Sequence, residues 1–177
     1  MRVKTGAVLA GIAALLLLLA ANSDPQLYLE FHSYPGEQVL HKLPVRKGDH
    51  FSTLIRHSIH LSPVYETYRI EDEGKIVLES TRLKDIGWGV PSTFEQTCTL
   101  RDGFMIIEGY EKVLPDLPFR VSAVNSAKLL VGDLPENPAA FAGQVIQLDD
   151  YVPDGRRITF RIVRVNGIVN VFHRLLS

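Results

Sequence analysis

Apolar and polar residues alternate in short stretches along most of the chain, and this pattern predicts β-strands. Residues 51–57 and 64–70 both show the two-residue period of a strand with one buried face. Further strands are predicted at 75–83, 104–108, 119–124, 128–131 and 144–148. Turns rich in Gly, Pro and Asp separate these stretches, which favours an all-β fold, an antiparallel sandwich or a partly open barrel.

Two local signals refine this fold. Asn166-Gly167 is the residue pair preferred in a two-residue hairpin turn, and it separates residues 157–165 from residues 168–175. This turn would pair Phe160 with His173 and Ile158 with Leu175. A second signal is Asn137 followed by Pro138, which predicts one capped helical turn.

The N-terminus has the layout of a secretory signal. Arg2 and Lys4 precede an uninterrupted apolar run over residues 6–21. A helix of that length spans about 24 Å, which is less than the ~30 Å hydrocarbon core of a bilayer. We therefore expect residues 1–23 to be a signal peptide or signal anchor. Residues 24–177 would form one extracytoplasmic domain, in the periplasm or on the outer face of the cytoplasmic membrane.

Composition excludes one class of partner. The chain has 19 Lys and Arg residues against 20 Asp and Glu residues, a formal net charge of −1. Binding to a phosphate backbone needs a basic excess, so we expect no nucleic-acid partner. Cys98 is the one cysteine, so packing rather than an intrachain disulfide must hold the fold. We interpret Cys98 as a small buried apolar residue.

The hairpin predicted over residues 51–70 would bring His57 and Glu66 together near its loop. Both fall on the more apolar face of their strands, and a carboxylate partly removed from water needs a partner. The pair would mark a binding site or act as a structural ion pair, and both interpretations stay open. Ser58 follows His57, but neighbouring strand residues point to opposite faces, which disfavours a serine hydrolase.

A metal site is the competing interpretation. His57, His60 and Glu66 would supply three ligands for a metal-assisted extracytoplasmic enzyme. The sequence has no His-Glu-x-x-His helix, no cysteine pair and no calcium-binding loop, so we assign no metal and no cofactor. We interpret the histidines upstream of this hairpin as scattered surface residues: His32, His41 and His50.

A tight turn completes the predicted binding surface. In Gly87-Trp88-Gly89-Val90-Pro91 the glycines permit positive φ, and Pro91 biases Val90 toward an extended conformation. The turn would either present Trp88 as a contact surface or fold back so that Trp88 covers the core. The full set of predicted binding residues is His57, Ser58, Glu66, Gly87, Trp88, Gly89 and Pro91.

These motifs together resemble a family of small exported bacterial and archaeal proteins described as a domain of unknown function. The resemblance depends on Phe51, His57-Ser58, Pro63-Val64-x-Glu66, Ile76-x-Leu78 and Gly87-x-Gly89-x-Pro91. Such proteins are often encoded beside TAXI-type TRAP transporters, which are tripartite ATP-independent importers with a periplasmic solute-binding protein. The resemblance implies a transporter component or its organic-anion solute as the partner.

The expected function is therefore that of an exported, non-enzymatic accessory or binding module associated with TRAP-type solute uptake. It would contact the membrane only through its N-terminal segment, if that segment stays uncleaved. Two alternatives stay open. They are the metal-assisted enzyme that uses His57, His60 and Glu66, and a purely structural surface protein.

Overall fold

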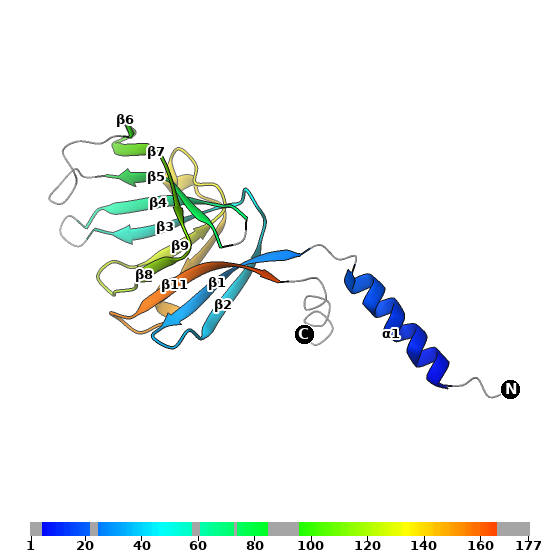
Figure 1. The fold of residues 1–177 in the computed structure, drawn as a ribbon. Coiled ribbons are helices and arrows are strands. Elements are labelled where there is room, and N and C mark those ends of the chain that lie inside the picture. The colour runs from blue at the N-terminus through cyan, green and yellow to red at the C-terminus, as the bar shows by residue number, and fades with distance from the viewer. Residues whose placement is uncertain (1–4, 22–24, 58–60, 73, 85–95, 166–177) are drawn as a thin grey trace.

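The computed structural model describes residues 5–21, 25–57, 61–72, 74–84 and 96–165. Apart from helix α1 (Thr5–Ala21), these residues form an almost entirely β body. Figure 1 shows α1 outside the two sheets. Its apolar side chains Ile12, Leu15 and Leu18 are more than half exposed. Within the described part of the chain, no helix has both the length and the apolar composition that a membrane crossing requires.

The strands form two antiparallel sheets (Figure 1), with the orders β2–β1–β11–β8 and β10–β9–β3–β4–β5–β7–β6. The four-stranded sheet contains β1 (Gln26–Tyr34), β2 (Val39–Val45), β8 (Leu117–Arg120) and β11 (Arg157–Val165). The seven-stranded sheet contains β3 (His50–Arg56), β4 (Pro63–Ile70), β5 (Ile76–Leu83), β6 (Thr97–Arg101), β7 (Phe104–Leu114), β9 (Lys128–Val131) and β10 (Gln144–Gln147). Neither described sheet closes into a barrel, so the prediction of an all-β, sandwich-like domain is confirmed.

The inner faces of the two sheets share one apolar core. Phe31 on β1 and Phe160 on β11 are fully buried and belong to the same cluster as Phe51 and Tyr68 on the facing sheet. The Phe51 and Tyr68 rings stack with centroids 5.1 Å apart, and Phe160 lies 6.4 Å from Phe51 across the interface. Aromatic pairs at these distances contribute beyond the area that they bury. The core therefore fixes which face of the seven-stranded sheet points inward.

Most predicted strands occur within a few residues of their expected positions, and the strand predicted at 128–131 matches β9. The helical turn is also confirmed. It is η1 (Pro138–Ala140), where the Asn137 side chain accepts a hydrogen bond of 3.0 Å from the Ala139 amide. A second 3₁₀ turn, η2 (Leu148–Asp150), follows β10. The prediction did not include β1, β2 or β6.

The predicted pairing of the C-terminal hairpin is wrong where the structure describes it. Phe160 pairs with Phe31 of β1 on one side and with Leu117 of β8 on the other, so both edges of β11 are occupied there. The pairs expected for Phe160 with His173 and for Ile158 with Leu175 are thus excluded. Residues 166–177, including the Asn166-Gly167 turn, lie outside the described residues. At Ile158 and Phe160, pairing with β1 and β8 takes the place of the predicted hairpin pairs.

The position of Cys98 also differs from the prediction. Cys98 lies on β6 at the edge of the seven-stranded sheet and is exposed rather than buried. An edge strand has a paired neighbour on one side only, so its side chains have fewer groups to pack against. Neighbouring Leu100 is 77% exposed for the same reason.

Candidate functional site

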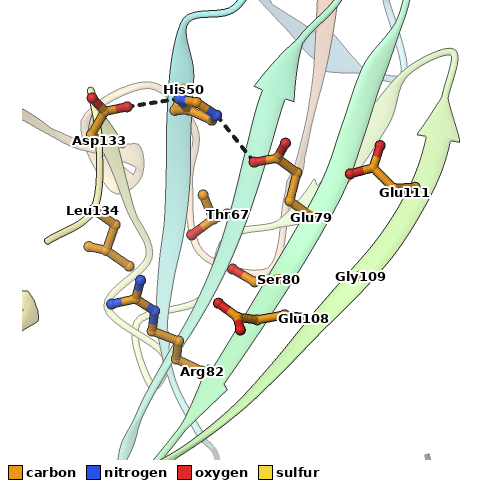
Figure 2. Close-up of a pocket in the computed structure, with 10 residues that line it drawn as sticks. All are labelled: His50, Thr67, Glu79, Ser80, Arg82, Glu108, Gly109, Glu111, Asp133 and Leu134. Atoms are coloured by element: carbon orange, nitrogen blue, oxygen red, sulfur yellow. Dashed lines mark hydrogen bonds and ion pairs between the residues drawn. The ribbon is translucent and has the colours of Figure 1, made fainter. Parts of the chain in front are cut away.

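A polar pocket of about 310 Å³ lies on the outer face of the seven-stranded sheet (Figure 2). Because Phe51 and Tyr68 point into the core, their strand neighbours His50 and Thr67 point outward into this pocket. β3, β4, β5 and β7 form its floor, and the segment after β9, which contains Asp133, forms one wall. We call it the outer-face pocket.

Two adjacent β-bulges meet at Glu79 on the pocket floor. Thr67 and Tyr68 of β4 pair with Ser80 and Leu78, which leaves Glu79 as an extra residue on β5. On the other side, Leu78 and Ser80 pair with Lys112 and Glu108, so three residues of β7 lie opposite Glu79. Bulges bend a strand and redirect its side chains, and they are frequent near functional sites. Both strands therefore change direction at the pocket.

The middle of the β7 bulge has an unusual backbone. Gly109 has φ +87° and Glu111 has φ +43°, and both residues line the pocket. A positive φ suits glycine but is uncommon for a residue with a side chain. This backbone directs the Glu111 side chain toward Arg69 on β4, with which it forms an ion pair of 2.9 Å.

His50 links the two sides of the pocket (Figure 2). Its Nε2 lies 3.1 Å from a Glu79 carboxylate oxygen, and its Nδ1 lies 2.8 Å from an Asp133 carboxylate oxygen. The two carboxylates come from different segments of the chain, β5 and the segment after β9. His50 therefore bridges two carboxylates that are distant in sequence.

Arg69 is the centre of the neighbouring ion-pair network. Its guanidinium contacts Glu71, Glu79 and Glu111. The hydrogen bond to Glu79 is the main cause that raises the pKa of Arg69 above its ordinary value. His50 pairs with Arg69 across β3 and β4, so one cationic residue stands beside the bridging imidazole. Together, Arg69 and His50 provide ionic partners for three pocket carboxylates, those of Glu79, Glu111 and Asp133.

The opposite end of the pocket contains Arg82, Ser80 and Glu108. Arg82 Nη1 donates to the carbonyl oxygens of Pro135 at 2.6 Å and Glu136 at 3.3 Å. Burial is the main cause that lowers the pKa of Arg82, and the negative charges of Glu108 and Glu136 oppose that shift. Within the described residues, the buried Nε atom of Arg82 has no acceptor.

A second, less polar cavity of about 250 Å³ adjoins the outer-face pocket. It is lined partly by core residues such as Leu29, Phe51 and Ile70, and it shares His50 and Asp133 with the outer-face pocket. The contact between His50 and Asp133 therefore lies where the two cavities adjoin.

The structure does not bring the predicted pair His57 and Glu66 together at the hairpin loop. The hairpin exists, but Glu66 pairs with Thr53, and His57 lies four residues further along the chain. Four strand residues span about 13 Å. Glu66 accepts a 2.7 Å hydrogen bond from the Tyr68 hydroxyl instead. The His57 amide donates to the Ser62 carbonyl oxygen at 2.8 Å. The loop of the hairpin therefore begins at His57, a boundary that the sequence pattern did not define.

The other predicted site residues cannot be placed. Ser58 and His60 lie outside the described residues, as does the turn that contains Gly87, Trp88, Gly89 and Pro91. Their roles in binding or in metal coordination stay predictions. Among the residues that are described, no group of three or more His, Cys, Asp or Glu side chains is arranged to hold a metal ion.

The interpretation of the upstream histidines as scattered surface residues is wrong for His32 and His50. His32 is 8% exposed, and its Nε2 lies 3.0 Å from a Glu30 carboxylate oxygen. His50 is partly buried between two carboxylates, as described above. Histidines are often exposed, so their number and spacing alone favoured the surface interpretation. The carboxylate partners of His50 are 29 and 83 residues away, too far for a local motif to show.

The sequence has no clear signal for the pocket. In β5 the residues Ile76, Val77 and Leu78 are all apolar, so both parities are represented before the bulge, and Leu83 shares the parity of Val77. The extra residue Glu79 is therefore evident only from the pairing of β5 with β4 and β7.

Comparisons with known proteins give one match. A search of the curated proteins and a search of the solved structures each found none. The model of a family described as Domain of unknown function (DUF1850) matches residues 51–134. This range contains all of the predicted motif residues and every residue of the outer-face pocket except His50. The predicted resemblance to a domain of unknown function is thus confirmed over residues 51–134, which match the model of this family.

Proposed function

We propose that the protein is an exported, non-enzymatic binding module that works beside a TAXI-type TRAP importer, and that the outer-face pocket is its ligand site. The observation that carries the proposal is the pocket itself. Pockets for small molecules begin at about 300 Å³, and they have a few polar groups that converge on the ligand. The outer-face pocket has this size, and all of its lining residues except His50 fall within residues 51–134, which match the DUF1850 model.

Features outside the pocket support the exported setting. Arg2 and Lys4 precede the apolar helix α1 (Thr5–Ala21), which is the order of a secretory signal. Placement outside the cytosol would put the pocket in the compartment where a TRAP solute-binding protein meets its solute. The transporter link itself comes from the resemblance across residues 51–91.

Quantitative co-purification tests the transporter link. The full-length protein with a C-terminal affinity tag would be produced at its native level in a host that carries the neighbouring TRAP genes. We expect TRAP subunits to be enriched over a tagged, unrelated exported protein. Equal recovery of these subunits with both baits would contradict the link to TRAP transport.

Protease access tests the compartment. We expect an externally added protease to degrade the domain in spheroplasts, whereas a cytosolic control protein stays intact. Protection of the domain until the cells are lysed would contradict export.

A further inference from the structure

Arg82 carries a positive charge that forms no ion pair within the described part of the chain. It lies half-buried in the outer-face pocket, where, among the described residues, it donates to two backbone carbonyl oxygens. Its Nε atom is buried and has no acceptor among the described residues. A guanidinium stays protonated in proteins, and a charge removed from water needs compensation. Arg82 can therefore bind an anionic group that enters the pocket.

Glu108 is the matching unpaired group on the next strand. Glu108 pairs with Ser80 across β5 and β7, and Arg82 is two residues from Ser80 on the same strand. Such diagonal neighbours in an antiparallel sheet lie about 7–8 Å apart. Within the described chain, the Glu108 carboxylate accepts no hydrogen bond and forms no ion pair. Glu108 and Arg82 thus line the same end of the pocket, where the negative charge of Glu108 acts on Arg82 although the two side chains form no ion pair.

Ser80 lies on the pocket floor directly across from Glu108 in the pairing of β5 with β7, two residues from Arg82 (Figure 2). The residue is buried, and its hydroxyl makes no hydrogen bond to any other residue that the structure describes. A hydroxyl can both donate and accept. This end of the pocket therefore brings together a cation, an anion and a neutral group that can donate and accept.

The other carboxylates that line the pocket, those of Glu79, Glu111 and Asp133, already have partners. Arg69 pairs with Glu79 and Glu111, and His50 contacts Glu79 and Asp133. Arg82 and Glu108 are the charged lining residues that this network leaves without an ion-pair partner in the described chain. Their opposite charges select against a simple anion, which Glu108 would repel, and against a simple cation, which Arg82 would repel.

We propose that the outer-face pocket binds a small zwitterion of the amino-acid class, with its carboxylate on Arg82, its ammonium group on Glu108 and Ser80 as a neutral hydrogen-bonding group beside Glu108. The proposal rests on the proposed function as a binding module and names the class of its ligand. A carboxylate and an ammonium group within one small molecule match the two opposite charges in the pocket. The volume of about 310 Å³ fits a ligand of this size.

Calorimetric titration of the full-length protein in mild detergent tests the proposal. The probes are the free amino acids, each compared with its analogue that lacks the amino group and its analogue that lacks the carboxylate. We expect at least one amino acid to bind at least tenfold more tightly than both of its analogues. An analogue that binds as tightly as its parent amino acid would overturn the proposal, and so would the failure of every amino acid to bind at millimolar concentration.

Two variants locate the site. We expect Arg82→Gln to weaken binding of the amino acid at least tenfold, whereas Arg120→Gln, at an exposed position on β8, leaves binding unchanged. Glu108→Gln, at an exposed position, should weaken binding of the amino acid and strengthen binding of the analogue without the amino group, because it removes the repulsion of a simple anion. Asp150→Asn, an exposed substitution outside the pocket with the same change in net charge, serves as its control. Wild-type affinity in Glu108→Gln would overturn the proposal even if Arg82→Gln failed to fold.

This result and the transporter result can be told apart. Enrichment of TRAP subunits without zwitterion binding would leave the transporter link intact and overturn the ligand class. Zwitterion binding that depends on Arg82 and Glu108, without such enrichment, would support the ligand class and contradict only the transport role.

Discussion

The two faces of the seven-stranded sheet place the same residue type in opposite settings. On the inner side, Glu66 lies beside the core and is tied to one neighbour, the hydroxyl of Tyr68, at 2.7 Å. On the outer side, Glu79 sits at two bulges, where it contacts both His50 and Arg69. Where strand pairing is regular, Glu66 has one hydrogen-bond partner. Where the bulges interrupt the pairing, Glu79 belongs to a network of charged side chains around a pocket.

This difference separates stability from binding within a single sheet. The inner face has little freedom, because side chains from both sheets fill it at close contact. The outer face of the same strands packs against no second sheet, so its polar residues are available for binding. Substitutions on the inner face should therefore mainly lower the free energy of unfolding. Substitutions on the outer face should change it less and should mainly affect binding.

The largest effect is expected from Phe51→Ala. Phe51 is fully buried and stacks on Tyr68, so its truncation leaves a cavity between the sheets and should cost about 3–5 kcal/mol of unfolding free energy. Chemical denaturation measures this cost. Leu100→Ala, at a side chain that is 77% exposed, is the control and should stay within about 0.5 kcal/mol of wild type. Similar losses for both variants would mean that the inner face does not dominate stability.

The inner hydrogen bond comes next. Tyr68→Phe removes the donor to Glu66 and leaves a carboxylate beside the core without its partner, which should cost about 1–3 kcal/mol. Adding Glu66→Gln in a double-mutant cycle should show that the two losses are not additive. Tyr110→Phe provides a matched control on β7. Strict additivity of Tyr68→Phe and Glu66→Gln would show that the bond contributes nothing.

The same tyrosine predicts an alkaline loss of stability. Burial is the main cause that raises the pKa of Tyr68, and Glu66 adds to it. Above about pH 10 the phenol of the unfolded chain loses its proton while the folded one keeps it, so rising pH favours unfolding. Between pH 9 and pH 11, wild type should lose about 1.4 kcal/mol more than Tyr68→Phe does. Parallel pH curves for the two proteins would contradict the raised pKa.

The outer face should give the smallest effects on stability. Glu79→Gln weakens contacts with Arg69 and His50 at a partly exposed site and should cost about 1 kcal/mol. Asp133→Asn alters a contact of a side chain that is 89% exposed and should stay within about 0.5 kcal/mol of wild type. Chemical denaturation of these two variants and of Phe51→Ala compares directly how much each face of the sheet contributes to the free energy of unfolding. A loss for Asp133→Asn as large as that for Phe51→Ala would remove the distinction between them.

Much of the fold could be predicted from local pattern. The period of two located β3, β4, β5 and β9, and the Asn137 cap located η1. β1 and β2 were missed although β1 is paired along its whole length with β11. The hairpin pairs predicted for Ile158 and Phe160 were wrong for a related reason, since strands distant in sequence occupy both edges of β11 there. The Asn166-Gly167 turn lies outside the described residues. A turn signal reports only what neighbouring residues prefer.

The candidate site was harder to predict. The sequence correctly drew attention to the β3–β4 hairpin, but it chose His57 and Glu66, on the assumption of a register that the structure does not have. A register is fixed by both partner strands and by the loop, so a small error moves two side chains apart by several ångströms. The outer-face pocket needed the bulges at Glu79 to be known first.

By itself, the sequence determined the fold class, the inward-facing residues of several strands and the resemblance to a domain of unknown function. These features depend on short-range periodicity and on motifs within one segment, which can be read along the chain. Only the tertiary structure placed His50 between Glu79 and Asp133 and brought Arg82 and Glu108 into one pocket without an ion pair among the described residues. Those relations join β3, β5, β7 and the segment after β9. They arise from strand order, register and bulges, which are set by packing of the whole sheet.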